Sequence, residues 1–353
     1  MSLTFDHVTL GQRVLFGTGA AVGNTIAAVE GLGAQRVLLI YDPFAVALAD
    51  AVAERVPVVQ RIDEIVQHVP VENATRATAD AVAGGIDVIV TIGGGSSTGL
   101  AKAVALKIGV PIVAIPTTFA GSEATDVWGM TEGRRKTTGT DPRVLPKVIV
   151  YDASLSARLP VAMAVASGLN AVAHVVDGFW APRADPINCA LGTEGLRALF
   201  PGLRGLVADP GNIDARERTL YGAYLAAVAF ASAGSGLHHK ICHTLGGAFN
   251  LPHAETHSIV LPYVAAFNVP FAPDAAERVQ ALLGVASAAA GLNALRTELG
   301  APASLSDIGL KESEISRAAE LTLPAVPPSN PRPVTVSDLE GIIRAAWAGE
   351  RIA

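Results

Sequence analysis

Short apolar runs alternate with helix-compatible segments along the first half of the chain. The runs that predict β-strands are rich in Val, Ile and Leu, and they span residues 36–41, 87–92, 111–115 and 147–151. The segments between them that predict helices are rich in Ala, and they span residues 45–55, 74–82 and 99–108. Uninterrupted apolar strands alternating with helices are typical of a parallel sheet covered on both faces. This half therefore predicts an α/β domain of the Rossmann-like, dinucleotide-binding kind.

The strand signals stop near residue 159, and Ala-, Leu- and Val-rich helical stretches follow. They span residues 162–177, 186–199, 214–233, 238–245, 275–292 and 336–348. The change predicts two domains, an α/β domain at residues 1–156 and an all-helical domain at residues 157–353. The long uncharged stretch at residues 221–237 is rich in Ala, Ser and Gly and runs into two histidines and a lysine. We interpret it as a buried core helix and not as a membrane span.

Composition excludes several classes of protein. Charged residues make up 16% of the chain, the broad apolar set 50%, and the net charge is −6. These values exclude a disordered or fibrous chain and give no electrostatic reason to expect binding to nucleic acid or to an anionic membrane. Two cysteines, Cys189 and Cys242, cannot form a disulfide framework, and the first residues carry no signal-peptide pattern. We expect a cytoplasmic protein.

Two loops at the ends of predicted strands predict a cofactor site. The sequence GGGSSTGLAK at residues 93–102 follows a strand, and its glycines let the backbone approach a ligand while the next helix, starting near Ser97, points its amides at a pyrophosphate. The alternative is a plain tight turn. The sequence PTTFAGSEAT at residues 116–125 follows the next strand and offers hydroxyl groups to ribose or phosphate. Asp42 ends an earlier strand and either binds the ribose of NAD or caps a helix that starts at Pro43.

Paired histidines in the helical half form a second group of candidates. Asn170 and His174 are four residues apart, as are His239 and His243, so each pair shares a helix face. His253 is expected in a loop, because two glycines at residues 246–247 are expected to end the preceding helix. Such a group could bind a divalent metal or supply proton donors, and clustering alone does not decide between the two.

The segment at residues 132–143 gathers four cations in a chain with few charges. It is interpreted either as a solvated loop or as a loop that binds phosphate or carboxylate groups. The two cysteines, by contrast, are expected to be small core residues.

Five segments together resemble one enzyme superfamily. They are GGGSSTGLAK, PTTFAGSEAT, WGMTEG with TGTDPRVLP, SGLNAVAH, and GLHHKICHTLGGAFNLPHAETHSIVLP. On these segments the chain resembles the iron-containing (group III) alcohol dehydrogenases over nearly its whole length, and within them the maleylacetate reductase family. The resemblance implies an NAD(P)-binding domain, a helical domain, a dehydroquinate synthase-like architecture and a homodimer.

The resemblance also implies roles for individual residues. The cofactor-binding positions fall on Asp42, Gly94, Gly95, Ser96, Thr117, Thr118, Ser122 and Lys136. The metal-binding positions of the superfamily fall on Asn170, His174, His239 and His253, with His243 as an additional site histidine. The sequence departs from the superfamily at two positions, where Asn170 replaces the usual carboxylate of the metal set and Gly99 replaces an aspartate. Because an amide oxygen is a poorer ligand than a carboxylate, we expect a metal-free site. If a metal is bound, its ligands are His174, His239 and His253.

The function implied is reduction of the C=C bond of maleylacetate to give 3-oxoadipate, in the degradation of aromatic compounds. NADH is the expected cofactor, with NADPH as an alternative, and His243 is the expected electrophile, with His174, His239 and His253 lining the pocket. The residues expected to bind the dicarboxylate are His238, Asn170, Arg134, Arg143 and Lys240. The rival hypotheses are a metal-dependent alcohol dehydrogenase, a lyase-like enzyme that uses NAD catalytically, and a non-enzymatic cofactor-binding sensor.

Overall fold

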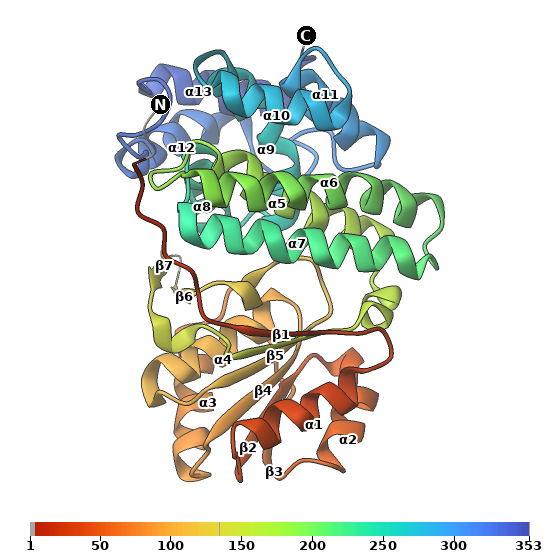
Figure 1. The fold of residues 1–353 in the computed structure, drawn as a ribbon. Coiled ribbons are helices and arrows are strands. Elements are labelled where there is room, and N and C mark those ends of the chain that lie inside the picture. Colours follow the sequence, from red (N-terminus) through yellow and green to blue (C-terminus); the bar gives the residue numbers. More distant parts are fainter. Residues whose placement is uncertain (1–3, 134, 353) are drawn as a thin grey trace. The chain divides into compact units, whose positions relative to one another are not determined.

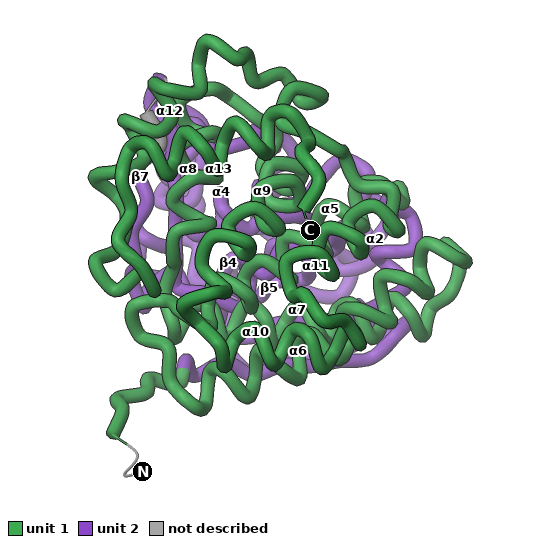
Figure 2. The backbone as a smooth tube through the Cα atoms, turned by 90° about the horizontal axis from the view of Figure 1, so that it is seen from above, with its two compact units in different colours: residues 1–9, 160–353 green, residues 10–159 purple. Residues whose placement is uncertain are grey.

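The computed structural model describes residues 4–133 and 135–352, except for the side chains of Arg135 and Lys136. The chain divides into two compact units, one of residues 10–159 and the other of residues 160–353 with the first nine residues (Figure 2). The early residues belong with the helical unit, where His7 Nδ1 lies 2.8 Å from Asp185 Oδ2. This grouping differs from the division at residues 156 and 157, which counted the N-terminal segment with the α/β domain.

The unit of residues 10–159 is built on a six-stranded parallel sheet with the order β1-β8-β5-β4-β2-β3. The strands are β1 (Arg13–Phe16), β2 (Val37–Tyr41), β3 (Val58–Ile62), β4 (Val88–Gly93), β5 (Ile112–Pro116) and β8 (Val148–Tyr151). The helices are α1 (Ala21–Gly31), α2 (Val46–Ala53), α3 (Val71–Ala83) and α4 (Gly95–Ile108). The predicted Rossmann-like α/β domain is confirmed.

The two faces of the sheet are covered by different helices, because successive side chains of a strand point to opposite faces. Val37, Leu39 and Tyr41 pack with residues of α1 and α2, whereas Leu38 and Ile40 pack with residues of α3 and α4 (Figure 1). Strands β2, β4 and β5 are buried along their whole length. The carboxyl ends of these central strands are where an open parallel sheet presents a ligand.

An antiparallel hairpin lies outside this sheet, formed by β6 (Val127–Glu132) and β7 (Arg135–Thr140). The expectation of a loop at residues 132–143 is wrong for most of the segment. Strand β7 contains only polar residues and a glycine, and β6 is half-buried with a glycine among its apolar residues, so neither shows the apolar run that marks a buried strand.

The second unit is helical, as predicted. Its helices are α5 (Val161–Gly178), α6 (Pro186–Ala208), α7 (Ile213–Ala233), α8 (Leu237–Phe249), α9 (His253–Asn268), α10 (Pro273–Leu283), α11 (Ala288–Glu298), α12 (Ile315–Thr322) and α13 (Val336–Ala348). The expected helix at residues 275–292 is two helices, because Gly284 ends α10 with a left-handed conformation at φ +69°. Helix α8 continues through the glycines at residues 246–247 to Phe249, so the predicted end of this helix was wrong.

Short 3₁₀ helices connect several of these elements. They are Pro43–Ala45, Ser122–Ala124, Pro142–Val144, Ala153–Arg158, Val269–Phe271, Glu312–Glu314 and Leu323–Ala325.

Two parts of the helical unit have the length and composition of a membrane span. Helix α5 is one, but 83% of it is buried inside the fold. Core helices of soluble proteins can be equally long and apolar. Helices α7 and α8 are long and apolar enough only when they are counted together as one span, and they bend by 99° at their junction. Gly234, with φ +85°, lies at this junction. The uncharged stretch at residues 221–237 is therefore a broken segment and not the single core helix expected.

Candidate functional site

The glycine loop connects β4 to α4, and the end of β2 packs against it. Asp42 Oδ2 accepts a hydrogen bond from the Gly94 N–H at 2.9 Å. A Cβ atom at Gly93 would lie 2.1 Å from Asp42 Oδ2 and 2.3 Å from Ser97 Oγ, so no larger residue fits there. Helix α4 begins at Gly95, two residues before the position expected, and no side chain caps its amino end. The first amides of α4 can therefore serve an anion.

The position of Asp42 bears on the two roles expected for it. Asp42 directly precedes the 3₁₀ helix at Pro43–Ala45, but its side chain makes no capping hydrogen bond to that helix. Its carboxylate instead holds the Gly94 amide of the glycine loop. The helix-capping interpretation is therefore wrong, and ribose binding by Asp42 stays a prediction.

The loop after β5 lies beside the glycine loop. The Thr117 N–H donates to the Gly93 carbonyl at 3.0 Å, and a Cβ at Gly94 would lie 3.1 Å from Thr118 Cγ2. The hydroxyls of Ser97 and Thr117 are buried without a hydrogen-bond partner in the described part of the chain. Buried polar groups of this kind are normally satisfied, so these hydroxyls indicate a polar ligand such as a dinucleotide. Ser96 and Ser122 are half-buried.

Lys102 of the glycine-loop helix has a structural role. Its Nζ donates to the carbonyls of Thr125 and Val127, each at 2.8 Å, and to Thr125 Oγ1 at 3.1 Å. These bonds connect α4 to the first strand of the hairpin. Burial lowers the pKa of Lys102 to about 7.

Three of the expected cationic residues are on or beside the hairpin. Arg134 lies outside the described residues, as does the side chain of Lys136. Arg143 is exposed, and its guanidinium binds Asp141 through Nη2 at 2.7 Å and Nε at 2.9 Å. The Arg143 side chain is thus held by its own loop, which weakens its case as a substrate ligand.

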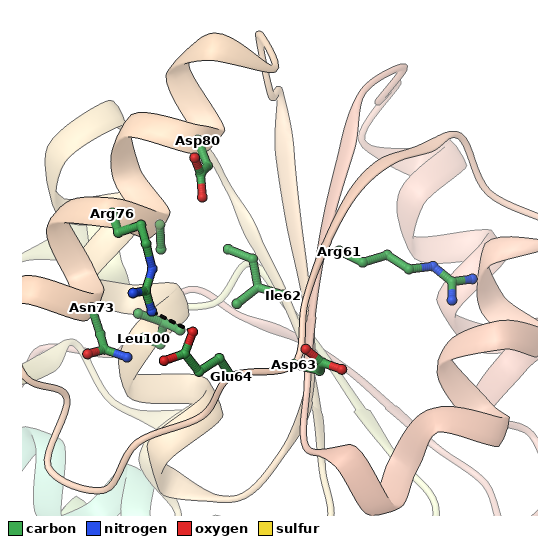
Figure 3. Close-up of a pocket in the computed structure, with 9 residues that line it drawn as sticks. Arg61, Ile62, Asp63, Glu64, Asn73, Arg76, Asp80 and Leu100 are labelled. Atoms are coloured by element: carbon green, nitrogen blue, oxygen red, sulfur yellow. Dashed lines mark hydrogen bonds and ion pairs between the residues drawn. The ribbon is translucent and has the colours of Figure 1, made fainter.

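A shallow pocket of about 200 Å³ lies between β3 and α3, apart from these loops (Figure 3). Both arginines that line it form ion pairs within the unit. Arg76 binds Glu64 at 2.7 Å, and Arg61 points away from the pocket and binds Asp50. Neither arginine is therefore left free to bind an anionic ligand in this pocket.

The helical unit brings the expected histidines together from three helices. Asn170 and His174 come from α5, and His239 and His243 come from α8. His253 is the first residue of α9, so its expected loop position is wrong. The ring centroids of His174 and His239 are 5.3 Å apart, and those of His239 and His243 are 5.9 Å apart.

His257, one turn further along α9, lies at the centre of this group. Its ring centroid is 4.4 Å from that of His253 and 4.8 Å from those of His238 and His239. No role was predicted for His257, although it follows His253 at a helical spacing of four residues. Once His253 had been assigned to a loop, that spacing carried no signal.

The cluster runs from buried to accessible rings. His174, His238, His239 and His257 are buried, His243 is half-buried and His253 is exposed. Burial lowers the pKa of His174 to about 4 and that of His238 to about 3, and it lowers the pKa values of His239 and His257 as well. The four buried imidazoles are therefore neutral at pH 7.

Several atoms of the cluster have no partner in the described part of the chain. They are Asn170 Oδ1, His174 Nδ1, His238 Nδ1, His239 Nε2 and His257 Nε2, all buried. Each buried polar atom left without a bond costs about 1–3 kcal/mol. Five such atoms in one place indicate a site that is completed by a polar ligand.

Comparisons with known proteins identify the family. The family described as "Iron-containing alcohol dehydrogenase" matches residues 11–153, and the family described as "Fe-containing alcohol dehydrogenase family, C-terminal" matches residues 164–347. The chain belongs to the iron-containing alcohol dehydrogenase family. A maleylacetate reductase from Pseudomonas sp. (strain P51) is 42% identical over 352 residues, covering 99% of each chain. The predicted resemblance to maleylacetate reductases is confirmed.

Solved structures agree with this placement. An iron-containing alcohol dehydrogenase from Corynebacterium glutamicum is 53% identical, with a TM-score of 0.96 over 99% of this chain and 98% of that one. A maleylacetate reductase from Agrobacterium tumefaciens is 38% identical, with a TM-score of 0.94 over 99% of this chain and 100% of that one. The family identifies the chain as an NAD(P)H-dependent oxidoreductase.

The family name implies a metal ion, and the residues at the metal-binding positions of the superfamily fit such an ion poorly. Among the described residues, His238, Cys242 and His257 form a group of three possible metal ligands. Their ligand atoms lie within 4.8 Å of one another. The inherited histidines His174, His239 and His253 do not converge in this way. The fourth inherited position is Asn170, a neutral amide that supplies no charge to a cation.

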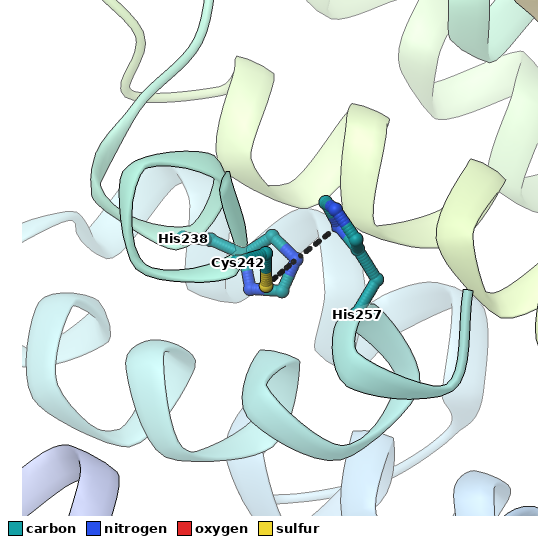
Figure 4. A group of neighbouring side chains, drawn as sticks. All are labelled: His238, Cys242 and His257. Carbon is teal, nitrogen blue, oxygen red and sulfur yellow. Dashed lines mark hydrogen bonds between the residues drawn. The ribbon is translucent and has the colours of Figure 1, made fainter. Parts of the chain in front are cut away.

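A hydrogen bond between His238 and His257 occupies part of this group of three side chains (Figure 4). His238 Nε2 and His257 Nδ1 are 2.9 Å apart, and Cys242 Sγ is 3.7 Å from His238 Nε2. Burial raises the pKa of the Cys242 thiol, which disfavours the thiolate that a metal needs. The nitrogens that lack partners, His238 Nδ1 and His257 Nε2, are on the opposite side of each ring from this hydrogen bond. Cys242 is a core residue, as expected.

The second departure from the superfamily, Gly99, is explained by a neighbouring side chain. A Cβ at Gly99 would lie 2.8 Å from Val69 Cγ2, which is closer than real Cβ atoms come. Val69 and His68 both have positive φ values, 50° and 63°, which are rare for residues other than glycine. The aspartate of the superfamily cannot be accommodated at position 99 without moving this segment.

Proposed function

We propose that the chain reduces the C=C bond of maleylacetate with NADH and forms 3-oxoadipate, without a metal ion. The observation that carries the metal-free mechanism is the buried cluster of neutral imidazoles with an amide at residue 170 in place of a carboxylate. The similarity to maleylacetate reductases along the whole chain supports the substrate. The glycine loop, the uncapped amino end of α4 and the unpartnered hydroxyls support the dinucleotide.

The reaction requires stabilisation of negative charge on the substrate. NADH, when bound, supplies a hydride, which adds to the alkene carbon β to the ketone of maleylacetate. Negative charge then develops on the ketone oxygen, and an imidazole N–H can stabilise it by a hydrogen bond. His243 is our choice for this electrophile, because it is half-buried on the same helix as His239. His174, His239 and His253 line the pocket.

The two carboxylates of the substrate need donors. Lys240 is half-buried and directly follows His239, and His238 and Asn170 supply neutral polar groups. A cation beside one carboxylate and an amide beside the other fit a dianion better than a carboxylate at residue 170 would. Arg143 and Arg134 are weaker candidates, the first because Asp141 holds it.

Three further expectations belong to this proposal. The protein is a homodimer, it acts in the cytoplasm, and residues 1–156 and 157–353 fold as its two domains, apart from the first nine residues, which group with the helical unit. Sedimentation and limited proteolysis test the first and the last of these.

The assay is NADH oxidation followed by absorbance, with maleylacetate as substrate and with or without EDTA. We expect turnover that EDTA does not reduce, and 3-oxoadipate as the product. Turnover that EDTA removes and Fe²⁺ or Zn²⁺ restores would instead support the metal-dependent alcohol dehydrogenase. NADH binding without turnover of any enone diacid would support a sensor.

A further inference from the structure

Lys102 lies about two turns into α4, the helix that follows the glycine loop. It is 1% exposed, and its Nζ donates to the carbonyls of Thr125 and Val127 at 2.8 Å each and to Thr125 Oγ1 at 3.1 Å. An ammonium group has three donors and no acceptor, so these three bonds use all of its donors. The Lys102 side chain is therefore bound to one short stretch of chain, at the end of the loop at residues 116–125.

The hydroxyl of Thr125 connects Lys102 to Ser122. Because the ammonium group can only donate, Thr125 Oγ1 must accept from it, and it also accepts from the Val127 N–H at 3.4 Å. The proton of this hydroxyl is donated to the Ser122 carbonyl, which is 3.3 Å away. Two accepted bonds and one donated bond are the full capacity of a hydroxyl group. Ser122 is thus joined to α4 through the side chains of Thr125 and Lys102.

Other groups hold the rest of the loop at residues 116–125. At its start, the Thr117 N–H donates to the carbonyl of the first glycine of the glycine loop at 3.0 Å. Near its end, the buried side chain of Glu123 accepts a hydrogen bond from the Tyr151 hydroxyl of β8 at 2.7 Å. Lys102 adds a bond between the last residue of the loop and α4. Both ends of the loop are therefore fixed to the β4 and α4 segment that carries the glycine loop.

We propose that Lys102 is a positioning residue of the cofactor site: acting through Thr125, it holds Ser122 and the rest of its loop against α4 in the arrangement that binds the dinucleotide. The proposal rests on the proposed use of NADH. Ser122 is one of the residues expected to bind the cofactor, and the amino end of α4 is expected to bind the pyrophosphate. Lys102 contributes to binding by fixing the distance between these two elements.

This distance matters because the ligand has to reach groups on both elements. Ser97 is on α4 and Thr117 is on the loop, and both hydroxyls are buried without a hydrogen-bond partner in the described part of the chain. A ligand that satisfies both hydroxyls needs the two elements at one separation. A loop free to move would have to be ordered at each binding event, and this ordering would weaken the affinity. Lys102 orders the loop before the ligand arrives.

The first test measures the loop without any ligand. Lys102→Met removes the ammonium group and keeps an unbranched side chain, and the matched control is Lys107→Met, which removes the same charge from the exposed last turn of α4. In hydrogen exchange, the amides of Ala124, Thr125 and Val127 should exchange at least about tenfold faster in Lys102→Met than in wild type. The amides of β2 should change less, and Lys107→Met should exchange like wild type.

The second test is the Kd for NADH, measured by fluorescence titration without maleylacetate. It is made at pH 6, because burial lowers the pKa of Lys102 to about 7 and the ammonium form predominates below that value. The Kd should rise at least about tenfold in Lys102→Met and stay within about twofold of wild type in Lys107→Met. In turnover, kcat/KM for NADH should fall by the same factor, while the KM for maleylacetate changes less than about threefold. A loss of folded protein alone would not separate the two substrates in this way.

Thr125→Val is the second variant, and it decides the matter if Lys102→Met does not fold. It keeps the shape of the side chain and removes the hydroxyl between Lys102 and Ser122, so the Kd for NADH should rise about three- to tenfold. A wild-type Kd in Thr125→Val overturns the proposal, and so does a folded Lys102→Met protein with wild-type Kd and wild-type exchange of the loop amides. A wild-type enzyme that binds NADH and does not reduce maleylacetate would contradict the proposed function and leave this proposal standing.

Discussion

Buried neutral histidines make the helical unit sensitive to acid. Burial lowers the pKa of His174 from 6.5 to about 4, so the folded chain resists a proton that the unfolded chain accepts. Because the folded pKa lies below the unfolded one, the free energy of unfolding is unaffected above pH 6.5, falls as the pH drops below 6.5, and levels off below about 4.

The size of the effect follows from these two pKa values. One pKa unit corresponds to about 1.4 kcal/mol. Between pH 7.5 and pH 4.5, His174 alone is expected to lower the free energy of unfolding by about 2–3 kcal/mol. His238, whose pKa burial lowers to about 3, acts in the same direction. The loss is large beside a typical total stability of about 5–15 kcal/mol.

The assay is urea unfolding of wild type and His174→Gln at several pH values between 4.5 and 7.5. Glutamine does not titrate, so the variant should lose about 2–3 kcal/mol less than wild type over this range. Phe230→Leu is the matched control, because Phe230 stacks on His174 at 4.7 Å and its loss removes packing without removing the titrating group. Its curve should run parallel to that of wild type. If His174→Gln also runs parallel, His174 takes up its proton in the folded chain and the reasoning is refuted.

Three more substitutions test the site. His243→Ala is expected to lower kcat by about 10²–10³, as loss of one preorganised donor does; near-normal turnover would show that another group polarises the ketone. Gly93→Ala places a methyl group within 2.3 Å of Asp42 and Ser97 atoms. The Kd for NADH, measured by fluorescence titration, should therefore rise at least tenfold, which is a loss of about 1.4 kcal/mol of binding free energy. The carboxylate of Asp42 predicts a higher kcat/KM for NADH than for NADPH, and Asp42→Gly should reduce the difference between the two values. Equal kcat/KM values for the wild type would contradict the binding of the NAD ribose by Asp42.

The central strands could be predicted from the sequence because burial on both faces gives them unbroken apolar runs. Strands β1 and β3 lie at the edges of the sheet, where Arg13, Gln60 and Arg61 interrupt the run, and neither was predicted. The hairpin β6-β7 was missed for the same reason. A pattern of hydrophobic positions reports burial, so exposed strands leave little signal.

Helix ends in the helical unit were harder to predict than the helices themselves. Two glycines at residues 246–247 signal a helix end, but α8 passes through them and ends at Phe249, and the next residue, Asn250, adopts a left-handed conformation. This error moved His253 into a loop and hid His257. Asp177, whose carboxylate lies 2.8 Å from His239 Nδ1, was also missed. Asn170, His174 and Asp177 lie four and three residues apart on one face of α5. That spacing was the signal that could have found it.

The positions of Asn170 and Asp177 together explain how this site can suit a dianion. Two unit charges of like sign 4 Å apart repel by about 4 kcal/mol at the effective dielectric of a protein surface. A carboxylate at residue 170 would impose such repulsion on a substrate with two carboxylates unless a cation offset it. The carboxylate of Asp177 lies instead on the Nδ1 side of His239, opposite the nitrogen that is left without a partner. There the ring separates the negative charge from whatever approaches Nε2.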